Sequence, residues 1–287
     1  MAKEYYIDIG SSTIKTYLFE GRRLDLVDEF STLYKDGFSK EAGVAADKLE
    51  LLFAELSKTP TADTKTFATG IWREIPAAQL AYIKSRVPNF NVISHEDEAR
   101  YLKRATEGLD FGGKKVLVIN MGGKTTELVS FAPGQKPTVQ AMIKVGVADM
   151  LDTFPEVNQP ISGATPEEMT DFVSDKIKDA DVGGGFDFAL FTGELRFEKL
   201  SGYPLSPNKM FSDANHPFQL TLDDFIAGTR RIFFDLTMDD LRALMPKNPG
   251  WMSGARPGAI LPLAVFKRAG INIIVPSDVN LINGVVL

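Results

Sequence analysis

Two short stretches of this chain repeat each other 112 residues apart. IDIGSSTIKTYLF, residues 7–19, and INMGGKTTELVSF, residues 119–131, both predict a strand, a glycine turn with hydroxyls and a second strand. The matched pairs at this offset are Ile7 with Ile119, Asp8 with Asn120, Gly10 with Gly122, Thr13 with Thr125 and Phe19 with Phe131. An ordinary pair of β-turns is the rival explanation, because glycine and serine are common turn residues. Agreement in register favours a duplicated unit.

The order of predicted elements also repeats. The predicted strands are residues 5–9, 16–19, 25–30, 66–69 and 91–94 in the first half, and 116–120, 127–131, 138–144, 186–191 and 271–275 in the second. The predicted helices lie at 49–56, from 76, at 96–106, from 165, from 221, at 257–268 and at 279–287. This order predicts an α/β protein of two duplicated lobes, residues 1–115 and 116–287. We expect each lobe to be βββαβαβα and a cleft to lie between them.

The composition narrows the class of protein. The 287 residues are 44% hydrophobic and 24% charged, as in ordinary globular domains, and their number favours two of them. No cysteine is present, which excludes disulfides and thiolate metal sites, and two histidines argue against a histidine-rich one. A formal net charge of -6 argues against binding to nucleic acid or an anionic membrane. With no signal segment or membrane-spanning run evident, we expect a cytoplasmic protein.

Glycine turns of this kind suit phosphate. Their backbone N–H groups can converge on an anion, and glycine permits close approach. Asp8, at a strand end beside the first turn, suits Mg²⁺ directly or through water. The predicted phosphate-binding residues are Gly10, Ser11, Ser12, Thr13, Gly122, Gly123, Lys124, Thr125 and Thr126.

Five segments carry a resemblance to known proteins. IDIGSSTIKTYLFE resembles the first phosphate motif of the actin/hexokinase/heat-shock-protein ATPase superfamily. Within that superfamily, four further segments resemble the exopolyphosphatase/guanosine pentaphosphate phosphohydrolase (Ppx/GppA) family: FATGIWREI (67–75), VISHEDEAR (92–100), VLVINMGGKTTELV, which is similar to its second phosphate motif, and PSDVNLINGVVL (276–287). The resemblance covers nearly the whole chain in the right order. It implies two ribonuclease H-like, actin-like ATPase lobes.

The resemblance also implies roles for single residues. Glu98 falls on the proposed catalytic glutamate, which would position or deprotonate the attacking water, and Arg73 falls on the phosphate-binding arginine. Asp8 and Glu127 would supply carboxylates for Mg²⁺, with Asn120 as a weaker partner acting through water.

Four departures from the family bear on activity. Asn120 replaces an aspartate and Lys124 a glycine, TGEL at 192–195 stands where the family has Gly-Gly-Thr, and His95 replaces a glycine. We hypothesise that the second lobe has exchanged some metal dependence for direct phosphate binding by Lys124.

Each assignment has a structural alternative. Acids in a first helical turn, such as Glu98, are favoured by the helix dipole without catalysis. Arg73 could be a solvated loop charge, and Glu127 an exposed residue of a half-buried strand. His95 is expected to be a loop residue, and Trp72 and Trp251 to serve packing.

Three functions therefore stay open. The first is a phosphohydrolase that cleaves a phosphoanhydride of polyphosphate or of a guanosine polyphosphate. The second is a sensor that binds a nucleotide or phosphate with little or no catalysis. The third is an ATP-dependent kinase of the same superfamily, which Asp8 and Lys15 would suit. The expected partner is a small polyphosphate or nucleotide, and a homodimer is left open.

Overall fold

The computed structural model describes residues 3–59, 64–192 and 195–287. The chain forms two compact units, Met1–Glu98 and Ala99–Val285. The division falls inside helix α3 (His95–Glu107), whereas the repeat in the sequence places the start of the second copy at residue 116.

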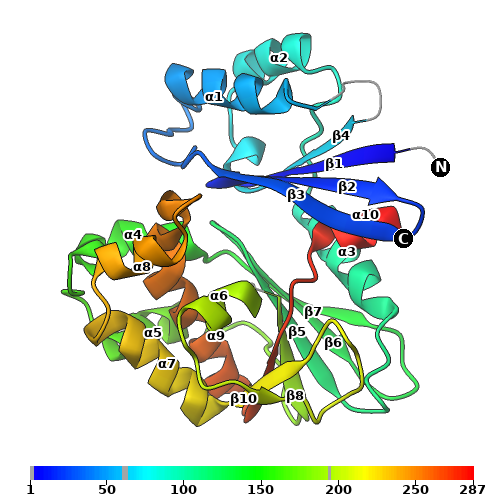
Figure 1. The fold of residues 1–287 in the computed structure, drawn as a ribbon, viewed down its shortest axis with the longest axis vertical. Coiled ribbons are helices and arrows are strands. Elements are labelled where there is room, and N and C mark those ends of the chain that lie inside the picture. The colour runs from blue at the N-terminus through cyan, green and yellow to red at the C-terminus, as the bar shows by residue number, and fades with distance from the viewer. Residues whose placement is uncertain (1–2, 60–63, 193–194) are drawn as a thin grey trace. The chain divides into compact units, whose positions relative to one another are not determined.

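The first unit is a four-stranded sheet with two helices on one face (Figure 1). Its sheet order is β3-β2-β1-β4, in which β1, β2 and β3 are antiparallel neighbours and β4 is parallel to β1. Ile7, Ile9 and Ile14 of the sheet pack with Leu52 and Ile83 of the helices. The elements are β1 (Lys3–Ile9), β2 (Thr13–Glu20), β3 (Arg23–Ser31), α1 (Ala46–Leu56), β4 (Thr64–Ala68), the 3₁₀ helix η2 (Gly70–Arg73) and α2 (Ala77–Arg86).

The strand predicted at 91–94 is reduced to one bridge. Ala68 and Val92 form an isolated parallel pair, in which Ala68 N–H donates to Asn91 and Ile93 N–H donates to Ala68. The pairing stops because Ser94 already caps α3, its hydroxyl accepting the N–H of Asp97 at 3.0 Å. The helix start therefore displaces the strand.

The second unit is built on a seven-stranded sheet of order β7-β6-β5-β8-β11-β10-β9. Its first three strands repeat the antiparallel ladder of the first unit, and β8 lies parallel to β5 as β4 does to β1. The strands are β5 (Val116–Met121), β6 (Thr126–Phe131), β7 (Thr138–Ile143), β8 (Phe188–Thr192), β9 (Ser206–Pro207), β10 (Phe218–Thr221) and β11 (Ile273–Pro276).

The helices of the second unit include several that the sequence pattern does not predict. They are α4 (Val147–Thr153), η3 (Pro155–Asn158), α5 (Pro166–Lys176), α6 (Leu195–Leu200), α7 (Leu222–Phe234), α8 (Met238–Leu244), η4 (Pro249–Gly254), α9 (Ala255–Ala269) and α10 (Leu281–Val286). The predicted opening of α5 is confirmed, because Thr165 and Glu168 form a reciprocal cap. The short helices α4, α6 and α8 were missed, as were strands β9 and β10. None of the described helices is long and apolar enough to cross a bilayer.

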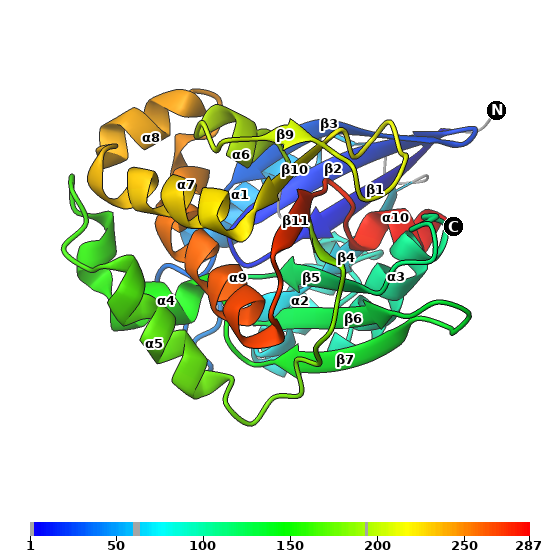
Figure 2. The ribbon, with the colours of Figure 1, turned by 90° about the horizontal axis from the view of Figure 1, so that it is seen from below.

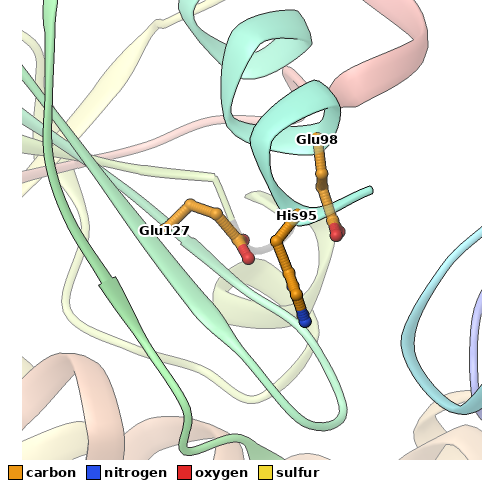
Figure 3. Close-up of side chains that lie close together, drawn as sticks. All are labelled: His95, Glu98 and Glu127. Atoms are coloured by element: carbon orange, nitrogen blue, oxygen red, sulfur yellow. The ribbon is translucent and has the colours of Figure 1, made fainter. Parts of the chain in front are cut away.

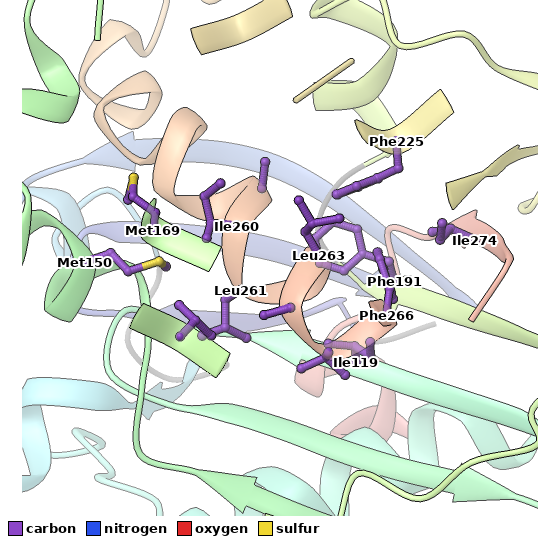
Figure 4. Packing of buried hydrophobic residues seen from close by; sticks show 14 of the residues in the cluster. Ile119, Met150, Met169, Phe191, Phe225, Ile260, Leu261, Leu263, Phe266 and Ile274 are labelled. Atoms are coloured by element: carbon purple, nitrogen blue, oxygen red, sulfur yellow. The ribbon is translucent and has the colours of Figure 1, made fainter. Parts of the chain in front are cut away.

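Helix α9 is the centre of the second unit's main core. Figure 2 shows it between α5 and α7, and Figure 4 shows Ile260, Leu261 and Phe266 of this helix among buried side chains of the sheet and neighbouring helices. The other face of the sheet is covered partly by α3, whose Leu102 packs in a second cluster with Val118.

The C-terminal segment that begins after β11 is held by a buried network of hydrogen bonds. His216 Nδ1 lies 2.9 Å from Asp213 Oδ2, and its Nε2 lies 2.7 Å from Ser277 Oγ. The connectivity is that of a serine-hydrolase triad. Ser277 is fully buried and its hydroxyl also accepts the N–H of Val279. These contacts give the three side chains a structural role, which is to hold the C-terminal segment in place.

Arg256 at the start of α9 is fully buried and is hydrogen-bonded only to carbonyls among the described residues. It donates to five of them, those of Val157, Gln159, Pro160, Ile232 and Leu236, at 2.7 to 3.1 Å. Ile232 and Leu236 lie at the C-terminal end of α7, where partial negative charge stabilises a cation. This one guanidinium therefore joins α9 to α7 and to the segment after α4.

Arg256→Met should lower the free energy of unfolding by about 3–5 kcal/mol, because buried carbonyls lose their donors. Urea denaturation measures this directly. Arg268→Met, on the exposed end of the same helix, is the control and should cost less than about 1 kcal/mol. Equal losses in the two variants would contradict the role given to Arg256.

Candidate phosphate-binding site

The two glycine turns have the same geometry. Gly10 N–H donates to Thr13 O at 2.9 Å, and Gly122 N–H donates to Thr125 O at 2.7 Å. A Cβ added at Gly10 or at Gly122 would lie 3.4 Å from that same carbonyl oxygen. The predicted repeat at an offset of 112 residues is thus a structural repeat.

Protein donors hold the carbonyl groups of the first turn. Trp72 Nε1 donates to Gly10 O at 3.1 Å, and Lys35 N donates to Ser11 O at 3.0 Å. A trans peptide is planar, so its N–H points opposite to its C=O. Fixing these two carbonyls therefore directs the N–H groups of Ser11 and Ser12 to the other side of the turn, as an anion site requires.

The segment after β3 completes this clamp. Thr32 N and Leu33 N both donate to Ser12 O, at 2.9 and 3.1 Å. Leu33 has φ of 49°, the single positive φ of a non-glycine residue in the described chain. Such a conformation persists only where neighbouring contacts impose it.

Ser11 has a structural role that the sequence did not predict. Its Oγ is buried and accepts the N–H of Ile71 at 3.1 Å. Gly70 has φ of 65°, and a Cβ there would lie 2.1 Å from this oxygen. The serine thereby ties the first turn to η2, the helix that carries Arg73. Ser12 and Thr13 are partly exposed.

Arg73 and Glu98 form a buried ion pair. Arg73 Nη1 lies 3.0 Å from Glu98 Oε2 and 3.1 Å from Ile93 O, and the two side chains are 13% and 6% exposed. Arg73 Nε and Nη2 are buried and have no acceptor among the residues that the structure describes. These two nitrogens form the side-on fork that binds a carboxylate or phosphate in bidentate fashion. The solvated-loop alternative for Arg73 is wrong.

Burial distinguishes Glu98 from its acidic neighbours. Figure 3 shows His95 and Glu98 projecting from the first turn of α3, and Glu127 projecting from β6. Glu96 is exposed whereas Glu98 is buried, so the helix dipole alone does not account for Glu98. Burial raises the pKa of Glu98, and the adjacent Arg73 opposes that rise. His95 is the first residue of α3, not a loop residue.

Asp8 is the penultimate residue of β1, beside the first turn, and is paired in register with Lys15 of β2. Burial, together with the charge of Glu98, raises the pKa of Asp8 to about 7, while Lys15 acts in the opposite direction. Mg²⁺ prefers carboxylate oxygens, so the Asp8 carboxylate is chemically suited to the predicted ion.

The second lobe has a different pair at the equivalent positions. Asn120 and Glu127 are register partners, as Asp8 and Lys15 are in the first lobe. Asn120 Nδ2 donates to Glu127 Oε2 at 2.9 Å, and Asn120 Oδ1 accepts from Thr192 Oγ1 at 3.0 Å. Glu127 is fully buried, so the exposed-strand alternative is wrong. Sequence reasoning missed Thr192, whose role appears only when β8 lies beside β5.

Helix α4 holds the second turn. Val147 N donates to Gly122 O at 3.2 Å and Ala148 N to Gly123 O at 2.8 Å. A Cβ on Gly146 would lie within 2.6 Å of the turn's backbone, so only glycine permits this approach. Two equivalent carbonyls are thus fixed in each lobe, by unrelated donors.

The polar side chains of the second turn are engaged within the protein. Thr126, predicted to bind phosphate, is fully buried and donates to Val145 O at 3.0 Å, and Thr125 is also buried. Lys124 Nζ lies 3.2 Å from Asp149 Oδ1 and 3.5 Å from Asp152 Oδ2. Of the TGEL segment, Gly193 and Glu194 lie outside the described residues.

Known structures match this fold over nearly its full length. The Ppx/GppA enzyme of Aquifex aeolicus has 19% sequence identity and a TM-score of 0.69, covering 99% of this chain and 98% of its own. An exopolyphosphatase from Cytophaga hutchinsonii has 16% identity and a TM-score of 0.76, with coverage of 99% and 96%. An exopolyphosphatase-like protein has 18% identity and a TM-score of 0.75, with coverage of 99% and 98%.

The chain therefore has the two-lobed α/β fold of these proteins. This confirms the fold class and, at the level of fold, the resemblance to the Ppx/GppA family. No family model matches the sequence, and no curated protein is similar to it. At these identities the likeness concerns the fold alone.

Asp8→Asn should raise the free energy of unfolding at pH 8 by on the order of 1 kcal/mol. The raised pKa means that the folded state holds a proton which the unfolded state has released, so stability falls as pH rises from about 4 toward 7. Asp8→Asn removes this fall in stability. The extra stability of the variant over the wild type should therefore disappear near pH 4. Urea denaturation at both pH values measures it, with the exposed Asp36→Asn as control. A destabilised Asp8→Asn variant at pH 8 would contradict the expectation.

Gly146→Ala should destabilise the protein by about 1–3 kcal/mol, because the new methyl group overlaps the backbone of the second turn. Gly258→Ala is the matched control, since its Cβ would meet only the flexible Met121 Cε at 3.4 Å. Thermal or urea unfolding of the two variants compares them. Equal stability would show that α4 is not packed on the turn as described.

Proposed function

We propose that this protein hydrolyses a phosphoanhydride bond of polyphosphate or of a guanosine polyphosphate. The observation that carries the proposal is the Arg73 guanidinium, which binds Glu98 with one nitrogen and whose Nε/Nη2 fork has no acceptor among the described residues. An unpaired buried guanidinium fork is costly unless an anion binds it. The fold shared with exopolyphosphatases is consistent with a phosphoryl group as that anion.

In this proposal Arg73 orients substrate and base together. The fork binds two oxygens of the transferred phosphoryl group, while the N–H groups of Ser11 and Ser12 contact neighbouring oxygens. Nη1 keeps the Glu98 carboxylate in place and ionised. Phosphoryl transfer depends mainly on positioning and charge stabilisation, so one fixed cation that does both is effective.

Glu98 acts as the general base. It accepts a proton from a water molecule, whose oxygen forms the new bond to phosphorus as the P–O bond to the leaving phosphate breaks. Burial raises the pKa of Glu98, which makes the carboxylate a stronger base than an exposed one. Arg73 counteracts full protonation of this group.

We assign Asp8 to Mg²⁺ in the first lobe and Glu127 in the second, with Asn120 contributing through Glu127 and water. The ion would neutralise charge on the phosphate oxygens. Because burial raises the pKa of Asp8 to about 7, binding of Mg²⁺ should weaken below pH 7.

A phosphate or nucleotide sensor is the second candidate. It is favoured by the engagement of Asn120 with Glu127 and of Lys124 with two carboxylates, which leaves the second lobe with little free charge for catalysis. Phosphate release from polyphosphates, pppGpp and ATP, with and without Mg²⁺, separates the candidates. Turnover supports the enzyme, and tight binding without turnover supports the sensor.

Glu98→Gln should lower kcat for phosphate release by about 10²- to 10⁴-fold, because the amide cannot accept the proton. Its carbonyl oxygen can still accept from Arg73, so the fold should be retained. Glu96→Gln, an exposed change in the same helical turn, is the matched control and should leave kcat unchanged. Equal activity of Glu98→Gln and the wild type would remove Glu98 as the base.

Arg73→Gln should move the acid limb of the kcat/KM profile to higher pH. Arg73 lowers the pKa of Glu98, so its loss raises that pKa and the base becomes protonated at a higher pH. Arg73→Lys keeps the charge but loses the planar fork. It should therefore shift the limb less while still raising KM. An unchanged limb in Arg73→Gln would contradict the coupling.

A further inference from the structure

Lys124 is the feature in which the second turn differs most from the first. It lies in the turn at the position equivalent to Ser12. Its ammonium contacts Asp149 at 3.2 Å and Asp152 at 3.5 Å, both on α4. With one cation and two carboxylates, this cluster has a formal charge of -1.

The two carboxylates are held in place relative to the turn. Val147 and Ala148 at the start of α4 donate to the turn's carbonyls, and Gly146 lies against its backbone. Asp149 Oδ2 also accepts the N–H of Gly146 at 2.9 Å, which fixes this carboxylate at the N-terminus of α4. Asp152 lies about one helical turn further on and is 76% exposed on its side chain.

We infer that Asp149 and Asp152 restrain Lys124 and thereby set the affinity of the second turn for phosphate. This inference rests on the proposed function, together with the prediction from the sequence that the second turn also binds a phosphate group of the substrate. The ammonium exchanges its two carboxylates for phosphate oxygens when a polyphosphate binds. Asp149 and Asp152 are specificity-determining residues of the turn, since only a ligand with enough charge outcompetes them.

The partial exposure of Lys124 and Asp149 makes the restraint on the lysine weak enough to be released. The side chains of Lys124 and Asp149 are each 34% exposed, so solvent screens the pairs and the lysine can be released. A phosphate group offers more charge than either carboxylate and accepts short charge-assisted hydrogen bonds. The apparent affinity of the turn is reduced by the fraction of Lys124 that remains held.

The experiment is calorimetric titration of the full chain with tripolyphosphate in Mg²⁺-free buffer. Asp152→Asn should bind it on the order of fivefold more tightly than the wild type, which is the factor that an exposed ion pair accounts for. Asp149→Asn retains an oxygen for the N–H of Gly146, so α4 keeps its cap. Adding Asp149→Asn to Asp152→Asn should tighten binding further.

Two controls separate release of the lysine from a general loss of negative charge. Glu156→Gln removes the same charge four residues beyond Asp152, without a contact to Lys124, and should change affinity less than twofold. In a Lys124→Met background, the effect of Asp152→Asn should likewise fall below twofold. This double-mutant cycle isolates the pair.

The outcomes separate this inference from the proposed function. If the wild type binds tripolyphosphate and Asp152→Asn binds no more tightly than Glu156→Gln, the restraint is refuted and the phosphate site stands. An unchanged effect of Asp152→Asn in the Lys124→Met background also refutes it. If neither the wild type nor any variant binds tripolyphosphate, the proposed function fails and the inference fails with it.

Discussion

The first-lobe site depends on the buried ion pair between Arg73 and Glu98. Removing two charges from water is costly, and the pair offsets this only through close geometry and further hydrogen bonds. Here Nη1 bonds to both Glu98 and the carbonyl of Ile93, while Nε and Nη2 have no acceptor within residues 3–59, 64–192 and 195–287. The arrangement is half satisfied, as expected for a site whose last partner is a ligand. The buried Ser11 contributes to this arrangement. Its hydroxyl accepts the N–H of Ile71 in η2 and so fixes the backbone that carries Arg73.

The two turns show what the duplicated unit keeps and what it varies. Both keep the hydrogen bond from the glycine N–H to the threonine carbonyl. In both, donors from outside the turn bind the turn's carbonyl groups. The donors differ: Trp72 and the segment after β3 in the first lobe, the start of α4 in the second. Because peptide planarity couples each carbonyl to the following N–H, different donors produce the same presentation of N–H groups.

The repeat in the sequence predicted the two sheets and the register of their first strands because strand periodicity and glycine turns are local signals. The constant offset also made Asp8 the counterpart of Asn120, whereas their cross-strand partners Lys15 and Glu127 appear only in the structure. The prediction of a strand at 91–94 was wrong except for one bridge, because Ser94 caps α3 and the helix begins at the next residue. Helix α4 was missed because VADMLDT is too short for a helical period to be recognised.

The site was predictable only in part for a similar reason. Burial separates Glu98 from Glu96, and burial depends on tertiary packing that spacing cannot show. Ser11 and Thr126 have hydroxyls suited to phosphate, yet the structure uses them for Ile71 and Val145. Lys124 looked like a free cation because its partners lie 25 and 28 residues further along the chain.

The central claim is that the free edge of Arg73 and the N–H groups of the first turn bind one phosphoryl group. The most direct measurement is a ¹⁵N–¹H spectrum recorded during titration with tripolyphosphate. We expect the Arg73 Nε–H resonance and the Ser11 and Ser12 amide resonances to shift together, with one saturation curve. An Arg73 Nε–H resonance that stays in place while the protein binds tripolyphosphate would contradict the account.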